Sequence, residues 1–469
     1  MIQFILNEQL IKTPLPPGST VLDFVRYQKR LMGTKIGCRE GDCGACTLLV
    51  GDFENDKLVY RSMTSCLMPL INAQGKHIVT VEGINMKTLS PVQQAMMDTN
   101  GTQCGFCTIG FVMSFTGFVL HEENKEYQKA VECVDGNICR CTGYKSIERA
   151  AAVISEKVND KPADSTIDWL VKNEFIPAYF TDIKTRLLAL QNSLQSNGRA
   201  TDGLTIGGGT DLNVQKHQIV KKSALNNVFD SKSLKGIRIG NNQCIIGASV
   251  TVTECSESKL MQDIFPNLDK HIKLVSSTPI RNMATLAGNL VNASPIGDIT
   301  VFLLALDAAV VLNNKNSSRT IKLKDFYKGY KQLDKAADEI ITLILFDVPS
   351  ANAVFNFEKV CKRTYLDIAS VNAAGLIQLD EKGDIEELHL SAGGVAPYPK
   401  YLSNTIAFLK GKKPTSSVLK EAIQVMNDEI TPISDARGTA DYKRLLLRQL
   451  FLAHFANIEE TVLNDLLIH

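Results

Sequence analysis

A chain of 469 residues exceeds one ordinary hydrophobic core and predicts three or four domains. Its 51 basic and 50 acidic side chains leave a formal net charge of +1, which gives no reason to expect nucleic acid or a membrane surface as partner. The longest apolar stretch, near residues 301–312, contains Asp307 and is shorter than the roughly 20 apolar residues of a membrane span. The N-terminus lacks the basic stretch and the cleavage site of a signal peptide, so we expect a cytoplasmic protein.

The predicted secondary structure changes from strands to helices near residue 85. Residues 2–6 and 10–13 flank a polar turn and predict a β-hairpin, followed by an amphipathic helix over 21–31 and short strands at 47–50 and 58–60. Helices are then expected over 91–100, 109–121, 126–134 and 147–158. The polar stretch 159–166, which contains Pro162, predicts a linker.

After this linker, glycine clusters and β-branched runs alternate with helical patterns. We expect strands near 374–378 and 389–393, and helices after Ser416 and Asp441. The fold class is therefore α+β in several domains. Their expected bounds are 1–85, 86–158, 167–348 and 350–465.

Cysteine is concentrated in the first third of the chain. Nine of the twelve cysteines precede residue 142, and the others are Cys244, Cys255 and Cys361. Structural disulfides are rare in cytosolic proteins. The crowding therefore predicts metal or redox chemistry in the first two domains.

The first cysteines have the spacing of a plant-type ferredoxin. Cys38, Cys43 and Cys46 form a C-x4-C-x2-C run, and Cys66 follows. A two-iron cluster needs four thiolates converging from a tightly wrapped loop, and three neighbouring glycines supply the backbone freedom. Structural zinc sites use paired C-x2-C knuckles, and only one such pair is present in this run. The run therefore predicts a 2Fe–2S cluster.

A second set combines a C-x2-C pair with a C-x-C pair. Cys104 and Cys107 are separated from Cys139 and Cys141 by a helical stretch. Taken alone, these four residues fit either a zinc site or an iron–sulfur cluster. Their position on helices directly after the first set favours a second 2Fe–2S cluster held between helix ends. Cys133 is left over and is expected to be a buried thiol.

Three motifs in order give the chain a family resemblance. GCREGDCGACT, QCGFCTIGF and CRCTGY follow one another within residues 37–144. They resemble the iron–sulfur part of the xanthine oxidase family of molybdenum hydroxylases, and the resemblance covers residues 1–158. It implies a β-grasp ferredoxin-like domain and a four-helix bundle, each with one 2Fe–2S cluster. In that family, the glutamine at the position of Gln103 hydrogen-bonds the pterin of the molybdenum cofactor.

A glycine-rich loop follows an apolar residue in the third domain. Its residues 205–212, TIGGGTDL, let the backbone approach a pyrophosphate, whose oxygens accept N–H groups in a nest. An ordinary tight turn explains the glycines equally well, and the G-x-G-x-x-G pattern of a Rossmann site is not present. A second segment, 278–298, is dense in small and hydrogen-bonding residues, as a buried phosphate and ribityl chain require.

The two segments together resemble the FAD domain of the same family, which has the fold of vanillyl-alcohol-oxidase (PCMH-type) flavoproteins. The resemblance implies that the loop holds the pyrophosphate and that Thr285, Asn289 and Asp298 bind the rest of FAD. Leu343 and Lys359 are expected to line the flavin pocket. The implied FAD-binding residues of the loop are Thr205, Ile206, Gly207, Gly208, Gly209, Thr210, Asp211 and Leu212. No catalytic residue is expected on this chain.

Two residues depart from the family pattern. Val275 stands where relatives often place a phenylalanine over the flavin ring, and Leu366 stands where they often have a polar or acidic residue. The first departure leaves aromatic stacking open, and the second weakens the expectation of nicotinamide contacts. The last segment resembles the family's CO dehydrogenase flavoprotein-like C-terminal domain, in which Asp435 and Arg437 are expected to fix a turn.

The resemblance implies an electron-transfer subunit. A molybdenum domain of several hundred residues has no counterpart before residue 469, so we expect the molybdenum-pterin cofactor on a molybdopterin-binding large subunit. Hypoxanthine or xanthine would be oxidised there to urate. Electrons would pass through the helical cluster, the ferredoxin-like cluster and FAD to NAD+. A heterotetramer of two small and two large subunits is expected.

Two alternatives stay open. The same architecture could serve an aldehyde or N-heteroaromatic hydroxylase, since the substrate pocket is expected on the other chain, although the fusion of iron–sulfur and flavin parts in one chain favours purine oxidation. A redox-sensing iron–sulfur flavoprotein belongs to a different class, which two cofactor types in series disfavour. The residues alone do not fix the substrate, the electron acceptor or the oligomeric state.

Overall fold

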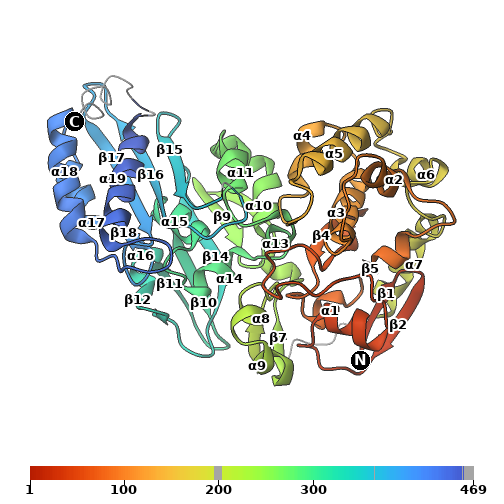
Figure 1. Ribbon diagram of the computed structural model, residues 1–469. Coiled ribbons are helices and arrows are strands. Elements are labelled where there is room, and N and C mark those ends of the chain that lie inside the picture. Colours follow the sequence, from red (N-terminus) through yellow and green to blue (C-terminus); the bar gives the residue numbers. More distant parts are fainter. Residues whose placement is uncertain (195–202, 364, 457, 459–469) are drawn as a thin grey trace. The chain divides into compact units, whose positions relative to one another are not determined.

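The computed structural model describes residues 1–194, 203–363, 365–456 and 458. The chain divides into two compact units (Figure 1). The first consists of Met1–Asp230 and Ser277–Ala284, and the second of Ser231–Ser276 and Thr285–His469. The four domain bounds expected from the sequence stay predictions, and residues 459–465 of the last domain lie outside the described residues. Among the described helices, none combines the length and apolarity that crossing a bilayer requires.

The first unit begins with a five-stranded mixed sheet in the order β2-β1-β5-β3-β4. The predicted hairpin is present, since β1 (Ile2–Leu6) pairs antiparallel with β2 (Gln9–Thr13). β5 (His77–Val79) runs parallel to β1, and β3 (Thr47–Glu54) lies between β5 and β4 (Lys57–Thr64). The predicted short strands at 47–50 and 58–60 are parts of β3 and β4, and the β-grasp expectation is confirmed.

The helix expected over 21–31 is shorter and less regular than predicted. One α-turn, α1 (Val21–Asp23), is capped by Thr20, whose Oγ1 accepts a first-turn N–H at 3.2 Å. It continues as a π-helix, η1 (Phe24–Gln28), and ends there. The Arg26 guanidinium donates to the carbonyl oxygen of Met32 at 3.1 Å, which draws the following chain back across the helix end. No glycine or proline stands at this position in the sequence to predict the end of the helix.

Four helices follow, as predicted. α2 (Pro91–Asp98) begins at a capping box formed by Ser90 and Gln93. α3 (Thr108–Leu120) is buried along most of its length and lies at the centre of an apolar core. α5 (Lys145–Lys157) packs against α2 and α4 (Tyr127–Glu132). These helices confirm the expected helical bundle.

The predicted linker is anchored by a buried lysine. Lys161 is 0% exposed, and its ammonium donates to the carbonyl oxygens of Val119, His121 and Asn124 at the C-terminal end of α3. Burial lowers the pKa of Lys161 to about 8. The next two helices, α6 (Thr166–Lys172) and α7 (Phe180–Ser193), contribute side chains to the apolar cores of the first unit.

The remaining elements of the first unit are short. A parallel pair of strands precedes and follows two helical turns, and one further turn comes from the distant segment 277–284. They are β6 (Leu204–Ile206), α8 (Leu212–Gln215), α9 (His217–Lys222), β7 (Leu225–Asn227), α13 (Thr278–Arg281), η2 (Leu70–Ala73) and η3 (Val81–Ile84).

The second unit contains two larger antiparallel sheets and a two-stranded antiparallel sheet of β12 and β13. The first has the order β11-β10-β14-β9-β8 and the second the order β15-β16-β17-β18. The strands are β8 (Ile237–Gly240), β9 (Gln243–Gly247), β10 (Ala309–Asn313), β11 (Ser318–Lys322), β12 (Tyr327–Gly329), β13 (Gln332–Leu333), β14 (Ile340–Asp347), β15 (Val354–Val360), β16 (Val371–Leu379), β17 (Ile385–Gly393) and β18 (Lys400–Tyr401). The helices are η4 (Lys232–Leu234), α10 (Val252–Glu257), α11 (Lys259–Ile264), α12 (Leu268–Lys273), α14 (Leu286–Asn292), α15 (Asp298–Leu304), α16 (Leu323–Phe326), α17 (Ser403–Leu409), α18 (Ser416–Glu429) and α19 (Ala440–Ala456).

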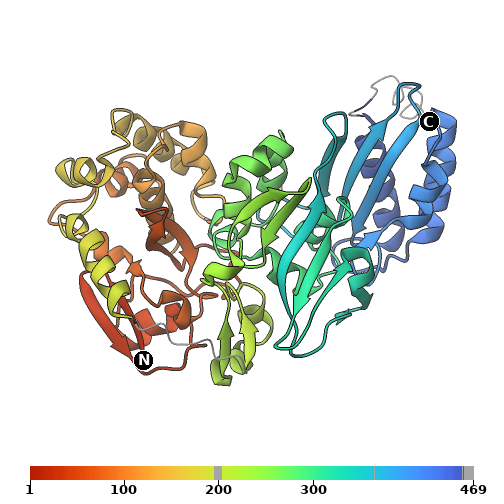
Figure 2. The ribbon, with the colours of Figure 1, turned by 180° about the vertical axis from the view of Figure 1, so that it is seen from behind.

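The β15–β18 sheet is covered on both faces, as its alternating pattern requires. Val371, Ala373 and Ile377 join the apolar core shared with α18 and α19, whereas Asn372, one residue out of phase, bonds Asp298 of α15. Figure 2 shows the strands of this sheet side by side from behind. The strands near 374–378 and 389–393 and the two C-terminal helices were all predicted from the sequence.

Two buried histidines meet one asparagine between α12, α19 and β15. His454 and His271 are 2% and 3% exposed, and His454 Nδ1 lies 3.1 Å from Asn356 Nδ2. Within the described residues, His454 Nε2 and His271 Nδ1 have no hydrogen-bond partner. Burial lowers the pKa of His271 to about 4 and that of His454 to about 3. Both rings are therefore neutral in the folded protein near pH 7.

We expect acid to destabilise the second unit through this pair. A histidine with a lowered pKa in the folded state binds its proton more readily when unfolded, so stability falls as the pH falls below the ordinary value of 6.5. Between pH 7 and 5 the loss is about 2 kcal/mol for each histidine. Urea unfolding at the two pH values measures it. His454→Leu should flatten this slope, and an unchanged slope in that variant would show that His454 is not responsible.

Candidate cluster and flavin sites

The structure brings the first four predicted ligands together in two pairs. The thiols of Cys38 and Cys43 lie close enough to shift each other's pKa, and so do those of Cys46 and Cys66. Cys46 begins the approach to β3 and Cys66 follows β4, so the antiparallel pairing of β3 and β4 places them at the same end of the sheet. Both are nearly fully buried, at 2% and 4% exposure.

The loop around these thiols points backbone donors at sulfur. The Cys38 N–H lies 3.4 Å from Cys43 Sγ, and the Glu40 N–H lies 3.3 Å from Cys38 Sγ. Gly41 and Gly44 have φ of 83° and 68°, a region where glycine carries no steric penalty. Such N–H···S contacts stabilise charge on a cluster's thiolates.

The thiols of the first set shift one another's pKa. Hydrogen bonding from Cys43 lowers the pKa of Cys38 to about 5, and the same interaction raises the pKa of Cys43. Hydrogen bonding from Cys66 likewise lowers the pKa of Cys46. Iron binding would displace the protons that these thiols carry.

The second set is also brought together in pairs. Cys107, at the start of α3, lies close enough to Cys139 for the two thiols to shift each other's pKa, and Cys104 likewise raises the pKa of Cys141. Burial opposes ionisation of Cys139, but the Thr142 hydroxyl, 3.1 Å from its Sγ, contributes to a lowered pKa. Cys104 and Cys141 are exposed, whereas Cys139 is buried. The spare thiol Cys133 is half-buried and donates to the Ala130 carbonyl at 3.0 Å.

Each set supplies the four cysteines that a 2Fe–2S cluster takes, two on each iron. Four cysteines also suit a tetrahedral zinc site. The two-iron assignment therefore rests on the spacing of the cysteines and on the N–H···S contacts of the first loop.

We therefore expect about four irons and four acid-labile sulfides per chain. Chemical analysis of the purified protein for iron, sulfide and zinc checks this number. Zinc at either set, or iron sufficient for one cluster only, would contradict the assignment of both sets.

The predicted glycine loop is a backbone cradle in the first unit. It follows β6, and in the part of the chain that the structure describes the amides of Gly207 to Thr210 donate to no carbonyl group. Two asparagine side chains tie the loop to the rest of the unit. Asn72 Nδ2 donates to the Gly207 carbonyl at 3.0 Å, and Nδ2 of Asn213, which directly follows the loop, donates to the Leu67 carbonyl at 2.7 Å. Successive free amides of this kind suit a pyrophosphate.

Close packing explains two of the glycines. A Cβ on Gly208 would lie 1.9 Å from the Met283 carbonyl oxygen, and one on Gly209 would lie 2.7 Å from that of Leu67. Gly209 also has φ of 83°. The loop therefore has glycine for structural reasons as well as for access to an anion.

The second predicted flavin segment, 278–298, divides between the units after Ala284. In the second unit, Thr285 caps α14 by accepting the Gly288 N–H at 3.2 Å. Asn289 Oδ1 accepts the Thr300 hydroxyl at 3.0 Å, and among the described residues its Nδ2 donates to no other group. The Thr285 hydroxyl is thus occupied as a helix cap, whereas the Asn289 Nδ2 can donate to a ligand.

Asp298 and Lys359 are joined by a buried ion pair. Lys359 Nζ lies 2.8 Å from Asp298 Oδ2 and 2.7 Å from the Leu274 carbonyl, and its side chain is 1% exposed. Asn372 Nδ2 bonds the other carboxylate oxygen of Asp298 at 2.6 Å. Sequence reasoning missed this pair because its members are 61 residues apart. Leu343, on β14, is half-buried.

The two departures from the family pattern are both buried. Val275 is 7% exposed, so its small side chain is enclosed by the protein. Leu366 is also 7% exposed and has φ of 50°, an unusual conformation for a residue other than glycine. Asp435 fixes the expected turn by accepting the Arg437 N–H at 2.8 Å, and Lys443 bonds its other oxygen.

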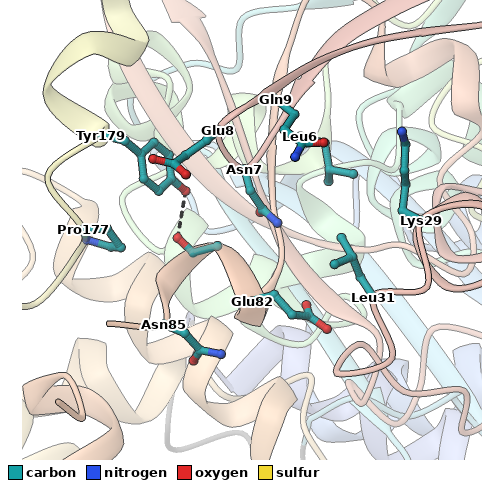
Figure 3. Close-up of a pocket in the computed structure, with 11 residues that line it drawn as sticks. Leu6, Asn7, Glu8, Gln9, Lys29, Leu31, Glu82, Asn85, Pro177 and Tyr179 are labelled. Carbon is teal, nitrogen blue, oxygen red and sulfur yellow. Dashed lines mark hydrogen bonds between the residues drawn. The ribbon is translucent and has the colours of Figure 1, made fainter. Parts of the chain in front are cut away.

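A pocket of about 420 Å³ lies in the first unit beside the β1–β2 turn (Figure 3). It includes none of the cysteines or glycines discussed above. Two of its polar side chains are engaged by the fold, since Tyr179 donates to the Gly83 carbonyl at 2.8 Å and Glu82 accepts from Gly33 and Thr80.

Four family models match the chain in succession. They are the 2Fe-2S iron-sulfur cluster binding domain at residues 4–70, the 2Fe-2S binding domain at 80–152, the FAD binding domain in molybdopterin dehydrogenase at 185–349, and the CO dehydrogenase flavoprotein C-terminal domain at 357–458.

The chain is similar over nearly its whole length to part of several larger proteins. It is 29% identical to the xanthine dehydrogenase of Emericella nidulans, over 97% of this chain and 38% of that protein. It is 26% identical to xanthine dehydrogenase 1 of Arabidopsis thaliana, over 97% and 39%. With the xanthine dehydrogenase/oxidase of Mus musculus it shares 24% identity, over 98% and 39%. The chain thus spans about two fifths of the length of these relatives.

Solved structures share the fold of about half of the chain. A Cu,Mo-CO dehydrogenase chain superposes with a TM-score of 0.50 at 24% identity, covering 53% of this chain and 86% of that one. A chain of the carbon monoxide dehydrogenase from Hydrogenophaga pseudoflava gives 0.50 at 24% identity, over 56% and 90%.

Together, the two cysteine sets and the matched domains are those of an iron–sulfur flavoprotein. The domain set matches the small, iron–sulfur and FAD subunit of the xanthine oxidase family.

Proposed function

We propose that the chain is the electron-transfer subunit of a xanthine dehydrogenase that oxidises hypoxanthine and xanthine to urate. The observation that carries the proposal is the convergence of two four-cysteine sets in a chain that also contains a FAD-binding domain. The choice of xanthine is supported by the curated relatives, which are named for it. Electrons would enter at the Cys104 set, pass to the Cys38 set, and leave through FAD to NAD+.

The surroundings of the second set support entry from a partner chain. Cys104 and Cys141 are exposed, and the nearby Phe106 and Tyr144 are 47% and 42% exposed. Large exposed apolar side chains are typical of protein interfaces. Gln103 is exposed beside them. We propose that this face meets a molybdopterin-binding large subunit, with two copies of each chain in the assembly, and that the complex is cytoplasmic.

The residues of this chain would hold FAD rather than do chemistry on it. When bound, FAD exchanges one or two electrons. The amides of Gly207 to Thr210 would bind the pyrophosphate, and Asn289 would donate from Nδ2 to another part of the FAD. The buried Asp298–Lys359 pair would fix the strand and helix that carry it, and Leu343 would offer an apolar wall.

Reduction of the complex by candidate substrates tests the function. With the chain bound to its large subunit, xanthine should bleach the flavin and iron–sulfur absorbance and NAD+ should restore it. Reduction by an aldehyde or by another N-heteroaromatic compound, with none by xanthine, would assign the same architecture to a different hydroxylase. Cluster reduction that never reaches FAD would overturn the electron-transfer role.

A further inference from the structure

One buried asparagine connects the two cysteine loops of the first unit. Asn137 is 5% exposed and lies two residues before Cys139. Its Nδ2 donates to the Gly44 carbonyl at 3.3 Å, and its Oδ1 accepts the Ser114 hydroxyl at 2.8 Å. Gly44 lies between Cys43 and Cys46, and Ser114 is on α3, the helix that begins beside Cys107. A single side chain therefore bridges the first loop, the second loop and the helix behind them.

The fit around this asparagine excludes other side chains. A Cβ on Gly44 would lie 2.4 Å from Asn137 Nδ2. A Cβ on Gly110, in the first turn of α3, would lie 2.1 Å from the Gly44 carbonyl oxygen and 2.8 Å from Asn137 Nδ2. Contacts this short require a neighbour to shift, so the three residues are packed to one another at close range.

A backbone hydrogen bond beside the asparagine joins the same two loops. The Ile138 N–H donates to the Cys43 carbonyl at 3.1 Å. Cys43 belongs to the first set, and Ile138 is bonded to Cys139 of the second. The Asn137 side chain is bonded through both its Nδ2 and its Oδ1. Because Asn137 directly precedes Ile138, these two bonds fix the direction of the Ile138 N–H toward the Cys43 carbonyl.

We infer that Asn137 is a positioning residue that sets the separation and mutual orientation of the two proposed clusters. The inference rests on the proposed function, since it requires both clusters. An amide suits the role because it is uncharged and both donates and accepts. A carboxylate of the same size would keep the bond from Ser114 but would lose the bond to the Gly44 carbonyl. Its negative charge would then face a carbonyl oxygen that otherwise accepts from the Thr47 N–H and hydroxyl, so the two loops would be pushed apart at this point.

The magnetic interaction between the two reduced clusters reports their relative placement. We would reduce the full-length protein and its Asn137→Asp variant with dithionite and record low-temperature EPR spectra. The variant should keep the parent's iron and sulfide content and lose the splitting that arises from the mutual interaction. Thr116→Val is the matched control, because it removes a buried hydroxyl from the same helix, where Thr116 donates to Val112. Its splitting should equal the parent's.

A second variant keeps the test decisive if Asn137→Asp loses a cluster. Ser114→Ala retains the Asn137 donor and removes only the hydroxyl that orients it, so a partial loss of the splitting is expected. The parent's splitting in Ser114→Ala would then overturn the inference. A parent protein with too little iron for two clusters overturns the proposed function itself. Full iron together with an unchanged splitting in Asn137→Asp overturns only the positioning role.

Discussion

Cys104→Ala should reduce the flow of electrons from xanthine to FAD to the background level. Cys104 is one of the exposed thiols of the second set and lies beside Cys141. Its loss removes one of the two cysteine ligands of one iron. In the proposed order, this cluster is the first acceptor from the partner chain. Stopped-flow absorbance of the complex mixed with xanthine measures the effect. Reduction by NADH, entering from the flavin, should still reach the cluster at Cys38, Cys43, Cys46 and Cys66.

The control for this variant is another cysteine of the same helical region. Cys133→Ala removes a thiol that bonds the Ala130 carbonyl and belongs to neither set. It should leave the xanthine-to-FAD rate at the parent's value. Should Cys104→Ala also transfer electrons at the parent's rate, the assigned order of the clusters is wrong.

Gly208→Val should strip FAD from the protein while leaving both clusters in place. The first added carbon already meets the Met283 carbonyl oxygen at 1.9 Å, so the glycine loop must move away from the segment it packs against. Overpacking of this kind costs about 1–3 kcal/mol, and the displaced amides no longer converge on a pyrophosphate. Flavin released by acid and quantified per chain, together with the iron content, gives the result.

A glycine in an open position supplies the comparison. Gly240, on β8, would place a Cβ no closer than 3.7 Å to Ile245 Cδ1, so Gly240→Val should retain the parent's flavin. Full flavin occupancy in Gly208→Val would refute the loop as the pyrophosphate site. Loss of iron together with flavin would show instead that the variant disrupts the whole first unit.

Local patterns predicted most of the secondary structure. The hairpin, the capped helix after Ser90 and the C-terminal helices depend on turn residues, caps and periodicity that act over a few positions. The spacing of the cysteines predicted the two ligand sets, and their assignment to clusters stays a prediction. The helix expected over 21–31 ends three residues early, at a point marked by a contact from Arg26 to the later Met32 carbonyl rather than by a breaker residue.

Contacts between distant residues could not be predicted in this way. The segment 277–284 belongs with the first unit because Asn282 bonds the Ser62 carbonyl, 220 residues away, and because Arg281 forms an ion pair with Asp135 at 2.6 Å. The anchor at Lys161 depends on three carbonyl groups at the end of another helix. No periodicity along the chain encodes such pairs.

A reductive titration of the isolated protein tests the central claim most directly. If the chain holds two 2Fe–2S clusters and one FAD, anaerobic titration with dithionite should consume about four electrons per chain, one for each cluster and two for the flavin. The visible spectrum should lose iron–sulfur and flavin absorbance together with this uptake. An uptake of about two electrons by protein that contains its full flavin would show that the clusters are absent and would contradict the account.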